Sequence, residues 1–187
     1  MKDLALREKN IVLIGFMGVG KTTIGKEVAK RLYRDFLDID EVIEKEYGMP
    51  TRQIFENFGE KEFRQKEKDT IVDLCHNQRL KVISVGGGAF LQEEIKEACL
   101  SKCIVFFLDL SWDAWQDRIS SIIDSRPVLQ GKNREDMRHL FDQRQPIYKD
   151  HHYKVTTDNL NVNEVADFIV DRLKTAWNKV DPNPEQQ

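Results

Sequence analysis

Near its N-terminus the chain passes from an unbroken apolar run into a glycine-rich stretch that ends in a lysine and two threonines. The run IVLIGF (11–16) has no polar alternation, which is typical of a strand covered on both faces in a parallel sheet. The letters GFMGVGKT (15–22) match G-x-x-x-x-G-K-[ST], the pattern of a phosphate-binding loop between a strand and a helix. Residues 21–33 then place apolar side chains on one helical stripe. The sequence therefore predicts a strand, a loop for phosphate groups and an amphipathic helix, in that order.

The chemistry of phosphate binding explains each residue type in this loop. Glycines let the backbone turn tightly and aim N–H groups at phosphate oxygens, and the following helix adds the positive end of its dipole. Lys21 can reach the β- and γ-phosphates, and the Thr22 hydroxyl can ligate Mg²⁺. The alternative is a plain glycine-rich turn with a solvated lysine, which the matching strand and helix on its two sides disfavour. The residues expected to bind a nucleoside triphosphate are Gly18, Val19, Gly20, Lys21, Thr22 and Thr23.

Short apolar runs alternate with helical patterns along the rest of the chain. Further strands are predicted at 35–40, 81–85, 103–110 and 152–158. Helices are predicted at about 60–78, 92–101, 111–124, 133–145 and 162–178, with one or two shorter helices in 41–58, broken near Gly48-Met49-Pro50. This alternation predicts a three-layer α/β domain around a mostly parallel sheet. Residues 179–187, which include two prolines, are expected to form a frayed, flexible tail.

Composition narrows the classes of function. The 187 residues are the length of one domain, and 29 Lys+Arg against 32 Asp+Glu give a net charge of -3, which disfavours a nucleic-acid partner. The longest strongly apolar run is far short of the ~20 residues of a membrane-spanning helix, and the charged N-terminus lacks the apolar core of a secretory signal. Three cysteines (Cys75, Cys99 and Cys103) favour reduced thiols. We therefore expect a cytoplasmic protein with neither a nucleic-acid nor a membrane partner.

Two acids follow the second predicted strand. Read as the end of that strand, Asp38 and Asp40 point the same way by alternation and lie beside the phosphate loop, because ligands bind at the carboxyl ends of parallel strands. One could hold Mg²⁺ through water, and the other could take or orient a hydroxyl proton. Taken alone, the pair is more typical of an N-cap and a first-turn acid of the next helix.

Three glycines and three arginines are further candidates for ligand binding. Gly86, Gly87 and Gly88 end an apolar strand and could offer backbone N–H groups to oxygen atoms, although a flexible turn would read the same way. Arg64 and Arg144 lie on apolar faces of predicted helices, where a guanidinium has an anionic partner in the protein or in a ligand.

Arg126 precedes a proline and a polar stretch (131–134) between two predicted helices. Such a segment is where a lid over phosphates would be built, and a plain loop arginine is the alternative.

A regulatory GTPase is a rival interpretation, because residues 178–181 read N-K-x-D. The letters fall at the end of a helical run before a proline-containing tail, rather than in a loop after a buried strand. No D-x-x-G occurs in the chain, so the match is attributed to chance.

Six segments in order resemble the motifs of shikimate kinases, the small P-loop enzymes of aromatic amino-acid biosynthesis. They are GFMGVGKT (15–22), FLDID (36–40), IFENFGEKEFR (54–64), SVGGGAF (84–90), SRPVL (125–129) and QRQPIY (143–148), within about residues 11–160. The resemblance implies the nucleoside monophosphate kinase fold with a five-stranded parallel sheet in the order 2-3-1-4-5. It further implies one domain over 1–178, with a substrate-binding region at 41–78 and a lid at 118–134. The implied reaction is transfer of the γ-phosphoryl of ATP to the 3-hydroxyl of shikimate, with Mg²⁺, by a cytoplasmic monomer.

The resemblance also implies roles for particular residues. Asp38 would hold Mg²⁺ through water, and Asp40 would contact the ring hydroxyls and orient or accept the proton of the attacking one. Arg64 and Arg144 would clamp the shikimate carboxylate. Gly87, with its neighbours Gly86 and Gly88, would supply N–H groups to the substrate.

The remaining roles implied by the resemblance concern the ring, the lid and the adenine. Phe55 and Phe63 would wall the apolar side of the ring, although core packing explains them equally well. Arg126 would swing in with the lid to meet the transferred phosphate. Arg118 and residues 157–159 are placed near the adenine.

Some alternatives stay open beside the resemblance. A kinase for another polyol acid, such as gluconate, shares the phosphate loop but should not need the set of Arg64, the three glycines and Arg144. Asp109 ends a strand of Walker B type and is a rival Mg²⁺ ligand; Asp38 is preferred because the family is expected to place VISVGGG beside the phosphate-loop strand and CIVFFLD farther out. Trp112 and Trp115 have no assigned role. We expect no zinc and no covalent nucleophile.

Overall fold

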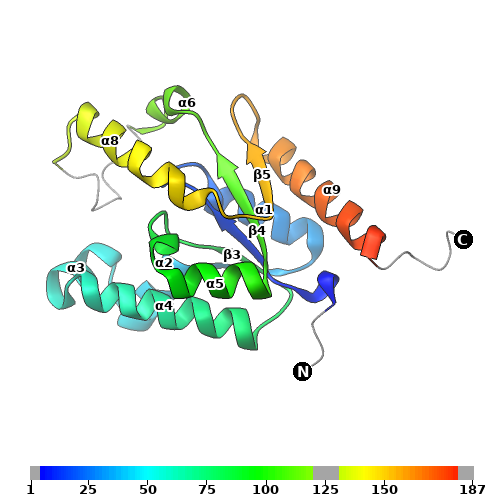
Figure 1. Cartoon of the computed structure of the whole chain (residues 1–187). Helices are drawn as coiled ribbons and strands as arrows, with labels where there is room; N and C mark the ends of the chain where they lie inside the picture. Colours follow the sequence, from blue (N-terminus) through cyan, green and yellow to red (C-terminus); the bar gives the residue numbers. More distant parts are fainter. Residues whose placement is uncertain (1–4, 120–130, 181–187) are drawn as a thin grey trace, which may run out of the picture.

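The computed structural model describes residues 5–119 and 131–180, which contain a central five-stranded sheet (Figure 1). Its strand order is β2-β3-β1-β4-β5, and each neighbouring pair is parallel. The strands are β1 (Ile11–Ile14), β2 (Asp35–Asp38), β3 (Lys81–Ser84), β4 (Ile104–Asp109) and β5 (Tyr153–Thr156). The predicted sheet and its order are confirmed.

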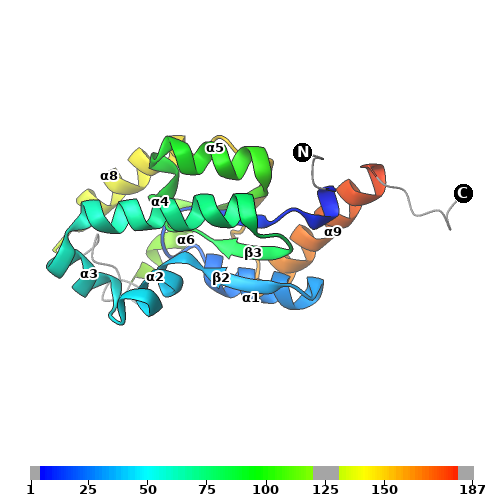
Figure 2. The same ribbon diagram turned by 90° about the horizontal axis from the view of Figure 1, so that it is seen from below.

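Helices cover both faces of this sheet. On one face lie α1 (Lys21–Leu32) and α9 (Val162–Val180), and on the other lie α4 (Glu60–Asn77) and α5 (Glu93–Lys102), as Figure 2 shows. The predicted three-layer architecture is therefore confirmed. The described residues also include short 3₁₀ helices: η1 (Leu6–Glu8), η2 (Ala89–Leu91) and η5 (Gln145–Tyr148).

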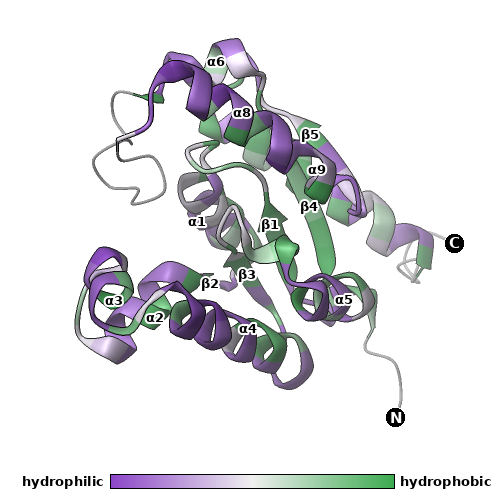
Figure 3. Cartoon of the chain, turned by 60° about the vertical axis from the view of Figure 1, so that its left-hand side comes forward, coloured by the Kyte–Doolittle hydropathy of each residue, from purple (hydrophilic) through white to green (hydrophobic). Residues whose placement is uncertain are grey.

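Within the described ranges, four further helices gather at the end of the molecule where the strands finish. Figure 3 shows one pair on one side of the molecule and the other pair opposite. The first pair is α2 (Ile39–Tyr47) with α3 (Thr51–Phe58), and the second is α6 (Trp112–Gln116) with α8 (Arg134–Arg144). The expected break in 41–58 is confirmed: α2 ends at Tyr47 and is capped by Gly48, whose φ of 66° is the left-handed conformation that glycine adopts easily.

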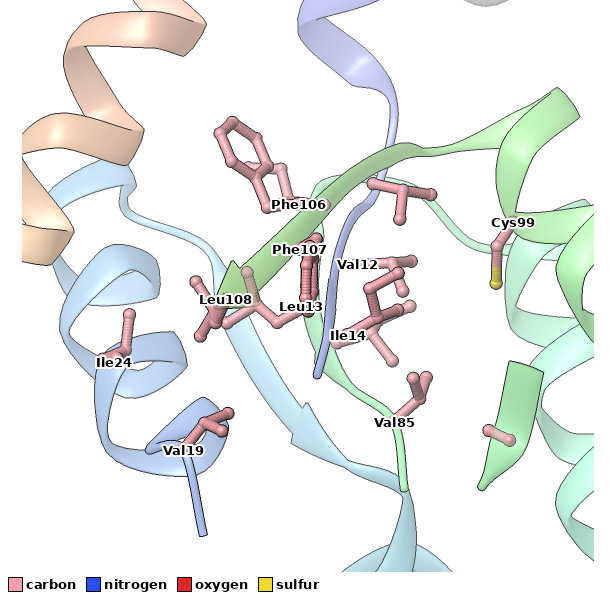
Figure 4. Packing of buried hydrophobic residues seen from close by; sticks show 14 of the residues in the cluster. Val12, Leu13, Ile14, Val19, Ile24, Val85, Cys99, Phe106, Phe107 and Leu108 are labelled. Carbon is pink, nitrogen blue, oxygen red and sulfur yellow. The ribbon is translucent and has the colours of Figure 1, made fainter. Parts of the chain in front are cut away.

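The central strand is the most deeply buried element. All four residues of β1 are 0% exposed, because the strand has a neighbour on each side and helices on both faces. Figure 4 shows side chains of β1 and β4 packed together, with α1 and its Ile24 on one side and α5 and its Cys99 on the other. The absence of polar alternation in the run 11–16 therefore has the predicted cause.

Several element boundaries differ from the sequence-based expectation. The second strand ends at Asp38 instead of residue 40, and α2 begins directly after it. Helix α9 extends to Val180, so residues 179 and 180 are helical and were wrongly assigned to the tail; residues 181–187 lie outside the described residues. Asn178 is on this helix, and its side chain accepts a hydrogen bond from Arg7. The N-K-x-D letters therefore do not lie in a loop after a buried strand, which agrees with a chance match.

The three cysteines come together between α4, α5 and β4. Cys75 Sγ lies 3.7 Å from Cys99 Sγ and 3.5 Å from Cys103 Sγ, and all three are buried free thiols.

Within residues 5–119 and 131–180, no helix combines the length and the apolar character needed to cross a membrane.

One buried polar side chain ties three elements together just before β1. Asn10 is 2% exposed, and its amide donates to the carbonyl oxygens of Leu74 and Gln78, each at 3.0 Å. Its side-chain oxygen accepts from the N–H of Lys81, also at 3.0 Å. The end of α4 and the start of β3 are thus fixed to the start of the central strand, and every polar atom of this side chain is satisfied.

Asn10→Asp should therefore destabilise the fold although it barely changes the shape of the side chain. A carboxylate has no proton for the two carbonyl oxygens, so both lose their donor and face a negative charge. We expect the free energy of unfolding, measured by urea denaturation at pH 7.5, to fall by about 3 kcal/mol. The same change at the exposed Asn57 is the control and should stay within about 0.5 kcal/mol of the wild type. Equal effects at the two positions would contradict the role given to Asn10.

Candidate active site

The phosphate loop occupies residues 15–20, between the end of β1 and the start of α1. Gly15 has a φ of 149°, and a Cβ atom placed there would lie 2.6 Å from the Leu108 carbonyl oxygen of β4. Only glycine allows the chain to leave the sheet this close to the neighbouring strand. The loop therefore starts at the position that the sequence pattern predicted.

The side chain of Lys21 lies within the curve of the loop. Lys21 is 9% exposed, and its ammonium donates to the carbonyl oxygens of Gly15 (2.7 Å) and Phe16 (3.0 Å). These carbonyls are thereby directed toward the lysine. Its position at the N-terminus of α1 is the one expected for a lysine that contacts phosphate oxygens.

Asp38 and Asp40 are close to the loop, but not for the reason first given. The strand-alternation interpretation is wrong, because β2 ends at Asp38 and Asp40 lies in the first turn of α2. The Asp38 carboxylate caps this helix by accepting from the N–H of Asp40 at 3.1 Å, as in the N-cap alternative. Both acids still line the cavity beside the loop, because α2 starts at the carboxyl edge of the sheet.

Thr22 and Asp38 offer a donor set suited to Mg²⁺. The Thr22 hydroxyl donates to Asp38 Oδ2 at 2.5 Å, so the two predicted metal-binding residues are in direct contact. Hydroxyl and carboxylate oxygens are the ligands that Mg²⁺ takes, alongside water and substrate phosphates. Among the described residues no group of three or more His, Cys, Asp or Glu side chains could hold a metal by itself. An ion bound here would therefore depend on phosphate oxygens as well.

Two cavities meet at this edge of the sheet. The first, of about 130 Å³, is lined by the phosphate loop and by Lys21, Thr22 and Asp38. The second is lined by two arginines, a glutamate and two phenylalanines: Arg64, Arg144, Glu67, Phe55 and Phe63. Both are lined by Met17, Asp40, Gly86 and Gly87, so the two cavities form one cleft with Asp40 at the junction.

Arg64 and Arg144 converge on the glycine turn that follows β3. A Cβ atom added at Gly88 would lie 2.9 Å from Arg144 Nη1 and 3.4 Å from Arg64 Nη2. Arg64 has an internal partner, because its Nη1 donates to Glu67 Oε2 at 2.8 Å. Arg144 Nη1 is buried and has no hydrogen-bond partner among the described residues. Burial lowers the pKa of Arg144, and the positive charge of Arg64 lowers it further. This end of the cleft therefore favours an anion.

Glu67 is a site residue that sequence reasoning missed. It is 0% exposed, and its Oε2 accepts from Arg64 and from Gln92 (3.0 Å). Its Oε1 is buried without a partner among the described residues and faces Gly86. Burial raises the pKa of Glu67; the charge of Arg64 opposes this shift, and that of Asp40 adds to it. Its spacing of three residues from Arg64 on one helix was the available signal.

Sequence reasoning also missed two aromatic residues next to the cleft, whose side chains donate hydrogen bonds to backbone carbonyl oxygens. Tyr148 is 1% exposed, and its hydroxyl donates to the Gly87 carbonyl at 2.5 Å. Burial raises the pKa of Tyr148, so the hydroxyl keeps its proton. Trp115 donates to the Met17 carbonyl at 2.7 Å. Nothing in the local sequence pattern identifies either partner.

Asp109 does not join the cleft. The expectation that its strand lies farther out is wrong, since β4 pairs directly with β1. Asp109 Oδ2 instead pairs with Lys154 Nζ of β5 at 2.8 Å, and Asp109 is absent from the residues that line the first cavity. Asp38 therefore remains the better candidate for Mg²⁺.

The other expected residues have mixed outcomes. Phe55 and Phe63 line the second cavity in an edge-to-face pair with ring centroids 5.0 Å apart. Arg118 lies beside the phosphate loop and donates to the Val19 carbonyl at 3.3 Å, while Thr157 is buried against the end of β4. That Arg118 and residues 157–159 lie near the adenine stays a prediction. Arg126, and with it the central part of the proposed lid, lies outside the described residues.

A parallel sheet, a phosphate loop with lysine and threonine, and an adjoining pocket for a small anion define a P-loop kinase of small molecules. Residues 17–174 match the family model described as shikimate kinase. A shikimate kinase of Oceanobacillus iheyensis is 60% identical over 97% of this chain and 99% of its own length. That of Bacillus subtilis is 54% identical over 97% of each chain. The chain belongs to the shikimate kinase family and is an ATP-dependent kinase.

Solved structures agree with this assignment. The shikimate kinase of Acinetobacter baumannii, in complex with shikimate, has a TM-score of 0.83 and 34% identity, over 90% of this chain and 94% of that one. A gluconokinase of Sinorhizobium meliloti covers 96% of this chain with a TM-score of 0.58 but only 13% identity, which shows likeness of fold alone.

Gly15→Ala should test whether the close approach of the loop to β4 is a requirement of the fold. The added methyl group would meet a backbone oxygen that cannot move without shifting the strand, at a φ that alanine rarely adopts. We expect the free energy of unfolding to fall by about 3 kcal/mol in urea denaturation. Gly48→Ala is the matched control: its φ is also positive, but its Cβ meets nothing within 4 Å, so only about 1 kcal/mol should be lost. Similar losses for both variants would contradict the steric explanation.

Proposed function

We propose that this chain transfers the γ-phosphoryl of ATP to the 3-hydroxyl of shikimate, giving shikimate 3-phosphate and ADP. Membership of the family supports this reaction. The single observation that carries it is the joined cleft, in which Asp40 borders both the phosphate cavity and the arginine cavity. A hydroxyl of a ring held by its carboxylate at the arginines would then lie next to the terminal phosphate.

The nucleotide end of the cleft is assigned to the loop and the start of α1. Backbone N–H groups of residues 18–23 would bind the triphosphate, with the helix dipole behind them. Lys21 would turn from the Gly15 and Phe16 carbonyls to the β- and γ-phosphate oxygens. Thr22 and, through water, Asp38 would hold Mg²⁺, which neutralises charge on the phosphates when bound.

The acceptor end of the cleft is assigned to α4, α8 and the glycine turn. Arg144 Nη1, buried and without a protein partner among the described residues, would bind the carboxylate together with Arg64. Glu67 would hold Arg64 in place. The N–H groups of residues 86–88 would bind substrate oxygens, and Phe55 and Phe63 would face the apolar side of the ring.

The phosphoryl transfer would require little of the protein beyond positioning the substrates and stabilising negative charge. Asp40 would orient the attacking hydroxyl or accept its proton. Lys21, and Arg126 from outside the described residues, would stabilise the charge on the transferred phosphoryl group.

We further propose a cytoplasmic monomer without a nucleic-acid or membrane partner. The net charge of -3 and the three buried thiols support this part of the proposal.

The decisive experiment measures ADP release with ATP, Mg²⁺ and either shikimate or gluconate as acceptor. We expect turnover with shikimate and none above background with gluconate. Asp40→Asn keeps the size of the side chain but removes its basicity, so kcat should fall by about 10²–10⁴-fold. Its affinity for Mg·ADP, measured by titration calorimetry, should stay within about twofold of the wild type. Turnover with gluconate would overturn the substrate assignment, and near-wild-type kcat in the variant would overturn the role of Asp40.

Gly88→Ala should weaken the acceptor end alone. Gly88 has a φ of -104°, which alanine adopts freely, so the effect comes only from a methyl group 2.9 Å from Arg144 Nη1. We expect KM for shikimate to rise about tenfold or more, because the two guanidinium groups can no longer converge on the carboxylate. Affinity for Mg·ADP and the temperature of unfolding should not change. Equal losses of affinity for both ligands would indicate general damage and contradict the assignment.

A further inference from the structure

We propose that Trp115 is a positioning residue for nucleotide binding: its indole N–H fixes the peptide between Met17 and Gly18 so that the Gly18 N–H faces the phosphate cavity. The inference rests on the nucleotide site of the proposed function. It does not depend on the identity of the acceptor.

The contact is short and enclosed. Trp115 is 0% exposed on α6, and its Nε1 donates to the Met17 carbonyl oxygen at 2.7 Å, across 98 positions of sequence. The ring stacks on Trp112 with centroids 5.1 Å apart and meets the Phe16 ring at 5.2 Å with an interplanar angle of 64°. Aromatic neighbours therefore hold the indole plane, so its N–H has one available direction.

The geometry of the peptide bond links the Trp115 hydrogen bond to the direction of the Gly18 N–H. A peptide is planar and trans here, so the C=O of Met17 and the N–H of Gly18 point in opposite directions. With the carbonyl held toward Trp115, the Gly18 N–H points away from α6. Gly18 lines the phosphate cavity, which is where a donor to a phosphate oxygen is needed.

This peptide needs an anchor because Gly18 imposes no preference of its own. Its φ of 80° is open to glycine, but glycine tolerates the opposite sign as readily, so the peptide could rotate at little steric cost. A rotated peptide would present a carbonyl oxygen to the phosphates. The Trp115 bond opposes this rotation, since the buried Met17 carbonyl would lose its donor.

Three other carbonyls of the loop also accept hydrogen bonds from side chains. Lys21 takes those of Gly15 and Phe16, and Arg118, just after α6, takes that of Val19 at 3.3 Å. Lys21 is itself proposed to turn toward phosphate when nucleotide binds. Trp115 lies before the proposed lid and is not a group proposed to move, so its bond holds the Met17 peptide in place while Lys21 changes partners.

The test compares two tryptophan variants by direct binding of Mg·ADP, measured by titration calorimetry without turnover. Trp115→Phe keeps an aromatic ring but removes the donor, and affinity should fall about five- to tenfold. Trp112→Phe is the matched control, because Trp112 is half-buried on the same helix and contributes ring contacts to the same cluster; it should stay within about twofold. Affinity for shikimate, titrated in the same way, should be equal in both variants.

A second replacement separates the donor from the packing if Trp115→Phe folds poorly. Incorporation of benzothienylalanine at position 115 keeps the bicyclic ring and puts sulfur in place of the N–H, and it should reproduce the loss of ADP affinity at an unchanged temperature of unfolding. ADP affinity within twofold of the wild type in this protein, or an equal loss of affinity for shikimate, would overturn the proposal. A wild-type protein that binds ADP but does not phosphorylate shikimate would overturn the proposed function and leave this test intact.

Discussion

The site depends on how tightly β1 fits between β3 and β4. A strand with parallel partners on both sides and helices on both faces favours apolar side chains, and all four residues of β1 are apolar and fully buried. Its close contact with β4 leaves room only for glycine where the chain turns out of the sheet. Because parallel strands end at one edge, β2 and β3 deliver Asp38 and the glycine turn next to this point. The position of the cleft is thus a consequence of packing the central strand.

Two charged groups in the cleft are buried at a cost to the stability of the protein. Arg144 has a buried nitrogen without a partner among the described residues, and burial lowers its pKa. Glu67 is fully buried, and its pKa is raised although Arg64 is bonded to it. Both shifts mean that the charged forms are held at a cost to stability, which an anionic ligand would offset at the arginine. A net charge of -3 for the whole chain gives no sign of these buried charged groups in the cleft.

Local patterns predicted the features that depend on neighbours in sequence. The phosphate loop, the alternation of strands and helices and the break at Gly48 follow from spacing and residue type, and the resemblance supplied the strand order. Asp38 and Asp40 were placed correctly for a wrong reason, because strand and helix-cap patterns share the same letters. Glu67 could have been found from its spacing to Arg64. Tyr148 and Trp115 could not, since their partners are backbone carbonyls 61 and 98 residues away and any residue type could supply them.

Those two aromatic residues act in the same way on the two glycine-containing turns that meet at the junction of the cleft. Each of these turns lines the cleft and is rich in glycine, which would allow the backbone to approach a ligand but leaves its peptides free to rotate. At one turn Trp115 holds the Met17 carbonyl, and at the other Tyr148 holds that of Gly87, so the next N–H in each chain segment, of Gly18 and Gly88, faces away from the anchor. A buried indole or phenol suits this task, because it has one donor, few rotatable bonds and a ring that neighbours can clamp. Glycine would give each turn its access to a ligand, and the distant aromatic donor restricts the turn to one conformation, which lowers the entropy that binding would cost.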